Sequence, residues 1–142
     1  MALPAFETPS EQRTRNMRAI RSSGNTSTEK RLCALLRTHR IRGWRSQPRD
    51  ILGKPDFLIK EKRLVVFVDG CFFHGCPRCG HIPRTNRSYW AAKISRNRLR
   101  DNVTSKALRA LGYRVVRIWE CRLRESPDRC LGRILRAIRS SC

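Results

Sequence analysis

The chain has 142 residues, and its 32 Lys and Arg residues against 11 Asp and Glu residues give a formal net charge of +21. This length suits one domain with one core, and 39% hydrophobic residues, including three Trp and five Phe, argue against wholesale disorder. A charge of this size needs a polyanion to offset its self-repulsion. We therefore expect a nucleic-acid partner.

The sequence gives no sign of a membrane or secreted protein. No stretch approaches the ~20 apolar residues of a membrane span, and residues 1–7 lack the basic and apolar parts of a signal peptide. We expect a cytoplasmic protein with no membrane contact. Seven cysteines are an odd number, and three of them cluster at Cys71, Cys76 and Cys79. In a reducing compartment, such a cluster indicates metal ligands rather than disulfides.

The first half of the chain predicts an arm, a helix and a hairpin. Residues 1–25 are basic and poor in apolar residues, which predicts a flexible basic arm with at most a short helix around 12–20. Residues 26–29 match a capping box, and the apolar stripe behind them predicts a helix ending near 40–43. The apolar runs 56–59 and 64–68 flank four charged residues, which is typical of a β-hairpin buried on both faces.

The second half alternates helix and strand. A loop rich in Gly, Pro and Cys spans 70–83, and apolar spacing over 88–111 predicts a helix that stops at Gly112. Residues 113–120 then read as a third strand and 127–140 as a last amphipathic helix. The whole order predicts a single α/β domain with a mixed central sheet flanked by helices.

Two carboxylates are expected at one edge of the hairpin. If the turn is centred between Lys62 and Arg63, Asp56 lies opposite Asp69. Facing carboxylates are unfavourable unless a cation lies between them, and oxygen ligands with an open shell suit Mg²⁺ acting on a phosphate. Either Asp could equally end a strand or form a turn, because Pro55-Asp56 and Asp69-Gly70 are both turn dipeptides.

Two further polar residues are ambiguous from the sequence alone. His74 follows Asp69 by five residues in the loop, so it is a candidate general base, and it is equally a candidate solvated side chain or zinc ligand. Glu29 is fully explained as part of the capping box.

The cysteine cluster predicts a structural zinc site. Cys71, Cys76 and Cys79 supply three thiolates, and tetrahedral Zn²⁺ needs a fourth ligand. Cys121 is our first candidate, because parallel neighbouring strands would bring the end of the third strand to the end of the second. His81 and His74 are the alternatives.

Two adjacent aromatic residues, Phe72 and Phe73, lie inside the same loop. Apolar wedges that unstack bases are one use of such a pair, and ordinary packing of one ring in the core and one over the loop is the other. Arginines at 96, 98, 100, 114 and 117 are candidate phosphate contacts or simply solvated charges.

A longer pattern resembles a known family. From about Asn16 to Cys121, the order of motifs resembles the very short patch repair (Vsr) DNA mismatch endonucleases. The matching strings are Asn16–Ile20, Glu29–Leu32, Pro55–Phe57, Val66–Pro77 and Arg117–Cys121. The resemblance implies a restriction-endonuclease-like fold over residues 26–142 and a Mg²⁺-dependent nick on the 5′ side of the thymine in a T·G mismatch. It also implies a monomer, and recruitment of other repair proteins stays open.

The resemblance also implies roles for individual residues. Asp56 would bind the catalytic metal with the Val68 carbonyl nearby, His74 would be the general base, and Glu29 would support them. Asp69 is a further catalytic candidate, although some relatives carry Thr-His where this chain has Val68-Asp69. No Glu-x-Lys follows Asp56, so His74 must replace the usual base of restriction enzymes.

The remaining implied roles concern zinc and DNA. Cys71, Cys76 and Cys121 fall on zinc-ligand positions, with Cys79 completing the set. Phe72 and Phe73 would wedge into DNA beside the mismatch, and Met17 would enter from the other groove. Two rivals remain: a related endonuclease of the same fold with another target, and a zinc-stabilised DNA-binding module without catalysis.

Overall fold

The computed structural model describes residues 26–139, so the predicted arm over 1–25 and its Met17 lie outside the described residues. The helices are α2 (Thr26–Thr38), α3 (Arg87–Ala110), α4 (Glu120–Glu125) and α5 (Pro127–Arg139). The strands are β1 (Trp44–Ser46), β2 (Phe57–Ile59), β3 (Leu64–Asp69) and β4 (Arg114–Trp119). These elements confirm a single α/β domain built on a mixed sheet.

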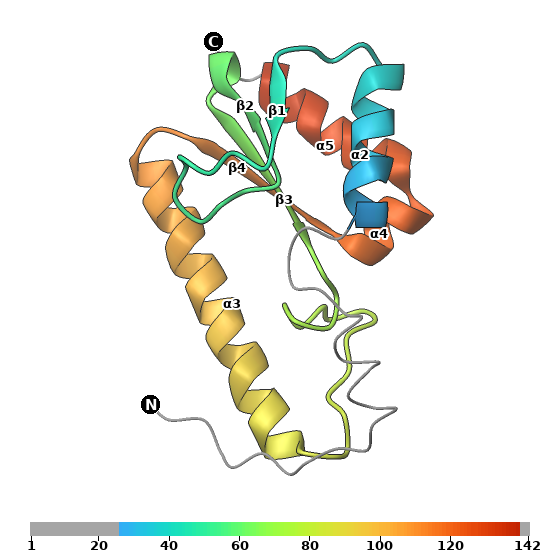
Figure 1. The fold of residues 1–142 in the computed structure, drawn as a ribbon, viewed down its shortest axis with the longest axis vertical. Coiled ribbons are helices and arrows are strands. Elements are labelled where there is room, and N and C mark those ends of the chain that lie inside the picture. The colour runs from blue at the N-terminus through green and yellow to red at the C-terminus, as the bar shows by residue number, and fades with distance from the viewer. Residues whose placement is uncertain (1–25, 140–142) are drawn as a thin grey trace.

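The four strands lie in the order β1-β2-β3-β4. The pairs β1–β2 and β2–β3 are antiparallel, whereas β3 and β4 are parallel. A parallel pair needs a long crossover, and here the loop after β3 and the helix α3 supply it (Figure 1). The parallel pairing places the ends of β3 and β4 side by side, with Asp69 opposite Trp119.

The expected register of the hairpin is wrong by two residues. Phe57 pairs with Val66, so the partner of Asp56 by continuation is Phe67 and not Asp69. The cause is the turn: residues Lys60–Lys62 form a 3₁₀ turn that Arg63 closes in the left-handed conformation (φ 48°). This turn is centred one residue earlier than the sequence suggested. Because side chains alternate with a period of two, both carboxylates keep the same face of the sheet.

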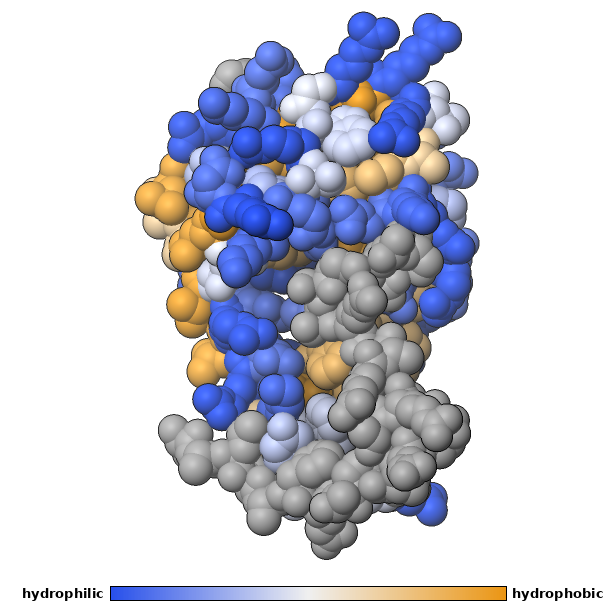
Figure 2. All heavy atoms as spheres, viewed as in Figure 1, coloured by the Kyte–Doolittle hydropathy of each residue, from blue (hydrophilic) through white to orange (hydrophobic). Residues whose placement is uncertain are grey.

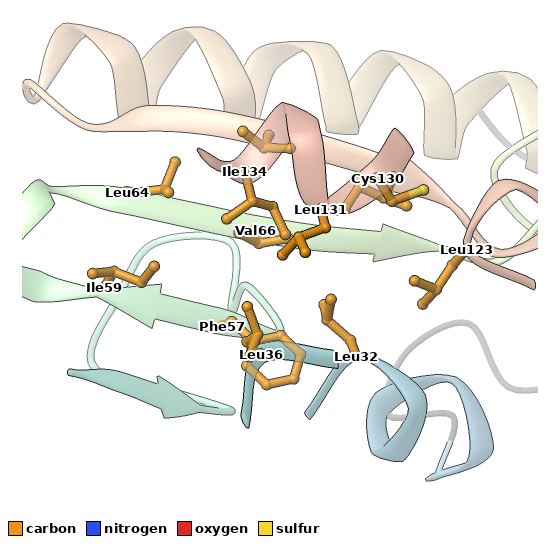
Figure 3. Packing of buried hydrophobic residues seen from close by; sticks show 12 residues of the cluster. Leu32, Leu36, Phe57, Ile59, Leu64, Val66, Leu123, Cys130, Leu131 and Ile134 are labelled. Carbon is orange, nitrogen blue, oxygen red and sulfur yellow. The ribbon is translucent and has the colours of Figure 1, made fainter. Parts of the chain in front are cut away.

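The larger core lies between the sheet and the helices α2, α4 and α5. Figure 3 shows side chains from α2, β2, β3 and α5 converging there, with Phe57 beside Leu36 and Leu131 above Val66. Leu32, Leu64, Ile118, Leu123 and Ile134 are fully buried in this cluster. Three helices and three strands therefore share one apolar interior.

The helix α3 covers the opposite face of the sheet (Figure 1), where Ile51 from the loop between β1 and β2 also packs. Its Leu108 packs with Leu58, Val65 and Phe67 in a second, smaller cluster. As predicted, the hairpin strands are therefore buried on both faces. Gly112 ends the helix with a φ of 91°, which is a conformation that glycine adopts without strain.

Two short elements escaped prediction. The strand β1 has three residues, two of them exposed, and lacks an apolar run. The helix α4 has six residues and follows β4 without a break, so the predicted strand over 113–120 runs one residue into it and the sequence predicts no helix there.

The surface of the described part is strongly hydrophilic. In the space-filling view, hydrophilic side chains cover most of the visible described face, and apolar side chains gather at one edge (Figure 2). The exposed large apolar residues are Leu52, Leu99, Val103 and Leu111. Within residues 26–139, none of the helices has the length and apolar character that crossing a bilayer requires.

Replacing a leucine of the larger core tests its contribution to folding. Leu32 is 0% exposed, so Leu32→Ala leaves a cavity and lowers the free energy of unfolding by about 2–5 kcal/mol in urea titrations at constant metal content. Leu99 is 66% exposed, and Leu99→Ala serves as the control, with a change within about 0.5 kcal/mol. Equal effects of the two substitutions would contradict this description of the core.

Candidate active site

A polar cavity of about 310 Å³ opens on the α3 side of the sheet, next to the ends of β2 and β3. Four residues predicted from the sequence meet there: Asp56, Val68, Asp69 and His74. The remaining lining residues are Gly53, Lys54, Phe67, Arg100, Asp101, Thr104 and Arg117. Carboxylates, an imidazole and cations in one cavity are the groups that phosphate chemistry uses.

Asp56 is fixed at the cavity by contacts from both neighbouring strands. The Val68 N–H donates to Asp56 Oδ2 (2.7 Å), and Gln47 Nε2 donates to Oδ1 (3.3 Å). Gln47 also donates its own N–H to the Asp56 carbonyl (2.8 Å). Burial raises the pKa of Asp56, the two hydrogen bonds lower it, and the charges of Asp69 and Glu29 raise it, so that the net shift is upward.

Asp69 carries an ion pair that sequence reasoning did not foresee. Arg117 NH1 lies 2.8 Å from Asp69 Oδ1, and the Asp69 side chain is 8% exposed. Burial raises the pKa of Asp69, while Arg117 and His74 oppose that rise. The expected pair of facing carboxylates is therefore replaced by a carboxylate with its own cation.

His74 is oriented by a carboxylate from α3. Its Nδ1 lies 2.5 Å from Asp101 Oδ2 and 3.8 Å from Asp69 Oδ1. The His74 side chain is 12% exposed. A carboxylate at Nδ1 favours the tautomer with its proton on that nitrogen, which leaves the Nε2 lone pair to accept a proton.

Asp101 is the functional candidate that sequence reasoning missed. A signal was present, because Asp101 is the only acidic residue among residues 87–110. Asp101, His74 and Asp69 lie with their ligand atoms within 4.8 Å of one another.

Glu29 lies in the first turn of α2. It is half-buried and close enough to Asp56 to raise the pKa of that carboxyl. It does not line the cavity, and the residue that would cap the helix lies outside the described residues.

The four predicted thiols form a separate cluster. The Sγ atoms of Cys71, Cys76, Cys79 and Cys121 all lie within 4.8 Å of one another, although they come from one loop and from α4. The six described cysteines are free thiols. Four thiols at this spacing fit one tetrahedral metal ion. His81 is exposed and lies beside the Phe72 ring instead.

The loop is shaped to present these thiols. Burial raises the pKa of Cys76, but the N–H groups of Cys79 and Arg78 and the neighbouring thiols outweigh burial and bring the pKa down to about 7. Gly80 follows at a point where a Cβ would lie 2.6 Å from the Cys76 carbonyl oxygen and 2.9 Å from the Cys71 carbonyl oxygen. Only glycine fits there.

The aromatic pair packs against α3. The Phe72 ring lies 5.0 Å from the Phe73 ring and 5.2 Å from the Trp90 ring, both edge to face. Both phenylalanines are half-buried, and Asn97 Nδ2 donates to the Phe73 carbonyl (2.9 Å). Neither ring enters the main core clusters.

Comparison with known proteins decides the family. The sequence model of the family described as "DNA mismatch endonuclease Vsr" matches residues 7–79. The "DNA mismatch endonuclease Vsr" of Escherichia coli K12 is 41% identical over 114 residues, covering 79% of this chain and 71% of the relative. This chain belongs to the Vsr DNA mismatch endonuclease family.

Two further Vsr relatives carry names of nicking enzymes. "Type II nicking enzyme V.XorIIP" of Xanthomonas oryzae pv. oryzae is 42% identical over 115 residues, covering 80% of this chain and 82% of the relative. "Type II nicking enzyme V.NaeI" of Lentzea aerocolonigenes is 37% identical over 115 residues, covering 76% of this chain and 67% of the relative. As a Vsr family member, the protein is a DNA-cleaving hydrolase.

Gly80→Ala tests whether the loop that carries the thiol cluster holds a metal ion. Its Cβ clashes with backbone atoms of Cys76 and Cys71, so we expect lost metal and a lower melting temperature, measured by elemental analysis and thermal unfolding. Gly132→Ala is the control, because a Cβ there meets nothing within 4 Å in the middle of α5. It should keep full metal content and stabilise the helix by about 0.5–1 kcal/mol. Full metal content in Gly80→Ala would rule out the described loop geometry.

Asp56→Asn tests the buried charge. The pKa of Asp56 is raised on folding, so above that pKa the charged form favours the unfolded chain. Without divalent ions at pH 8, Asp56→Asn should melt at a higher temperature than the wild type, with the advantage shrinking as the pH falls through the raised pKa.

The control for this substitution is Asp50→Asn. The pKa of Asp50 is lowered by its backbone hydrogen bond and by Arg45. Removing the Asp50 charge should therefore not raise the melting temperature at pH 8. A lower melting temperature for Asp56→Asn than for the wild type would contradict the burial of charge at Asp56.

Proposed function

We propose that the protein nicks one strand of duplex DNA on the 5′ side of the thymine in a T·G mismatch. The name of the Escherichia coli relative supports a mismatched substrate, and the names of the other relatives support nicking. The observation that carries the proposal is the meeting of Asp56 with the His74–Asp101 pair in one polar cavity. In the same proposal, the mixed sheet has the restriction-endonuclease-like arrangement.

Asp56 is the proposed ligand of a catalytic Mg²⁺, with the Val68 carbonyl as its neighbour. Carboxylate and carbonyl oxygens are the ligands that Mg²⁺ prefers. The ion, when bound, would neutralise charge on the phosphate. The Val68 N–H and Gln47 hold the carboxylate in place before any ligand binds. The repulsion of Asp56 by Asp69 and Glu29 also favours a nearby cation.

His74 is the proposed general base. With Asp101 at Nδ1, the imidazole would accept a proton from the attacking water at Nε2 while the water oxygen attacks the phosphorus atom. The bond from phosphorus to the leaving sugar oxygen then breaks, and that oxygen takes up a proton from solvent water. Asp101 is a positioning residue that orients the ring and stabilises the imidazolium. Asp69 acts inside the cavity and Glu29 outside it, each by its charge.

The four thiolates are proposed to hold a structural Zn²⁺. A closed four-thiolate shell leaves no position for water, so the ion ties the loop to the sheet rather than activating a nucleophile. The loop carries Phe72, Phe73 and His74 between Cys71 and Cys76. Metal binding thus fixes both the proposed base and the proposed wedge.

Recognition of DNA is assigned to the aromatic pair and to the arm. Phe72 and Phe73 are half-buried beside Trp90, which supports a role in which the rings would stack beside a mispair. In this proposal, residues 1–25 form a DNA-contacting arm that carries Met17, and residues 26–142 form the endonuclease domain, acting as a monomer. The net charge of +21 supplies affinity and salt sensitivity rather than sequence preference.

One assay tests the proposal. Wild-type protein with Mg²⁺ is incubated with an end-labelled T·G duplex and its T·A control, and each strand is resolved on a denaturing gel. We expect a single nick, 5′ of the mismatched thymine, in the T·G duplex only. Asp56→Asn should bind the T·G duplex and retain its zinc but nick it at least on the order of 100-fold more slowly.

The alternative outcomes are distinct. Nicking of both duplexes would favour an endonuclease with another target. Binding without nicking by the wild type would favour a DNA-binding module. Normal nicking by Asp56→Asn would overturn the assignment of the site.

A further inference from the structure

The strongest unassigned feature of the cavity is a fixed arginine. Arg117 comes from β4 and extends over the sheet to the cavity, where its side chain is 22% exposed. Neither Mg²⁺ binding nor proton transfer by His74 uses this guanidinium. The sequence made it one of five candidate phosphate contacts or solvated charges, and the proposed mechanism gives it no task at the hydrolytic site.

Three groups hold the guanidinium in one orientation. Its Nε donates to Ser105 Oγ (2.8 Å), NH1 donates to Asp69 Oδ1 (2.8 Å), and NH2 donates to the Asp101 carbonyl (3.3 Å). Its Cζ also lies 4.1 Å from the centre of the Phe67 ring. Contacts from α3, from β3 and from an aromatic face together leave the side chain little rotational freedom.

The other cations that line the cavity are less constrained. Lys54 and Arg100 are both exposed, and Arg100 donates to Asn97 (3.2 Å) rather than to a carboxylate of the site. A cation already held in place stabilises a charged transition state without the cost of ordering itself during the reaction. Among the cations at this cavity, Arg117 has that property.

The donor count leaves room for a phosphate. A guanidinium carries five N–H groups, and the three contacts from Ser105, Asp69 and the Asp101 carbonyl take one from each nitrogen. NH1 also lies 3.9 Å from Asp101 Oδ1, which is beyond hydrogen-bond distance, so one N–H on NH1 and one on NH2 remain for a ligand. Paired N–H groups of arginine match the oxygens of a phosphate.

We propose that Arg117 is a catalytic residue that binds a non-bridging oxygen of the scissile phosphate, with Asp69 and Ser105 as its positioning residues. The proposal rests on the assignment of this cavity as the hydrolytic site. It gives Asp69 a different task from metal binding. The buried carboxylate aims the cation that meets the substrate.

The first experiment measures binding and needs no catalysis. Zinc-loaded protein without Mg²⁺ is titrated with a T·G duplex and with the same duplex carrying a neutral methylphosphonate 5′ of the mismatched thymine. The wild type should bind the neutral duplex on the order of 10-fold more weakly, because a charge-assisted hydrogen bond is lost. Arg117→Met should bind the two duplexes equally well.

The second experiment separates catalysis from folding. Arg117→Met should nick the T·G duplex on the order of 100-fold more slowly under single-turnover conditions. Because this change leaves Asp69 without its cation, the double variant Arg117→Met/Asp69→Asn restores charge balance and should melt like the wild type yet stay slow. Arg129→Met removes an exposed charge from α5, on the other side of the sheet, and should nick at the wild-type rate.

Three results would overturn the proposal. In the first, wild type and Arg117→Met discriminate equally between the T·G duplex and its methylphosphonate form. In the second, Arg117→Met nicks the T·G duplex within about 3-fold of the wild-type rate. In the third, the double variant nicks it at the wild-type rate. The last result would give Arg117 the sole task of neutralising Asp69. If the wild type binds the methylphosphonate duplex more weakly but does not nick the T·G duplex with Mg²⁺, the proposed function is refuted and the phosphate contact still stands.

Discussion

The parallel pairing of β3 with β4 is the constraint on which the rest of the structure depends. It aligns the ends of two strands that are far apart in sequence, with Asp69 opposite Trp119. Cys71 and Cys121 follow directly from those ends, so the thiol cluster closes across the pair. The same register puts Arg117 two residues before the end of β4, from where its guanidinium spans to Asp69. The thiol cluster and the polar cavity are thus two results of one strand pairing.

The helix α3 supplies the side chains that hold the loop after β3 and complete the cavity. Its side chains hold the loop after β3 at three heights: Trp90 meets the phenylalanine rings, Asn97 binds the Phe73 carbonyl, and Asp101 orients His74. Asn97 is 8% exposed and Ser105 5% exposed, and each finds a hydrogen-bond partner among the described residues. Buried polar groups that are satisfied in this way favour one geometry over its neighbours. The helix therefore positions chemistry as much as it covers the sheet.

Elements with long apolar patterns were predictable from the sequence, and short-range geometry was not. The apolar spacing in α3 and α5 and the continuous runs in β3 and β4 predicted those elements to within a few residues. The hairpin register depended on Arg63 adopting a left-handed conformation, which no residue pattern announced. The cavity lining was partly foreseen, because Asp56 directly precedes β2, Asp69 ends β3 and His74 follows in the next loop.

Asp101 and Arg117 could not be placed in the same way. Arg117 looks like one charge among many on an arginine-rich surface. Asp101 stands out as the only acidic residue among residues 87–110, but nothing in the sequence indicates its partner. Only the packing of α3 against β4 brings the two residues to the cavity. The thiol cluster was easier, since cysteines are rare and their spacing is restrictive. Residues that meet in one site can thus be recognised from the sequence when their residue type is rare and their spacing is restrictive, as for the cysteines.

The two faces of the sheet carry different tasks. The side chains of the larger core lie toward α2, α4 and α5, whereas the residues of the cavity lie toward α3. Strand residues on opposite faces alternate along the backbone, so a change of side chain on one face leaves the other face largely in place. Sequence drift or deliberate repacking around Leu131 and Ile134 can therefore alter the heat resistance of the enzyme without reshaping the cavity on the α3 side. This separation makes the chain a suitable scaffold for a thermostable DNA-cleaving reagent.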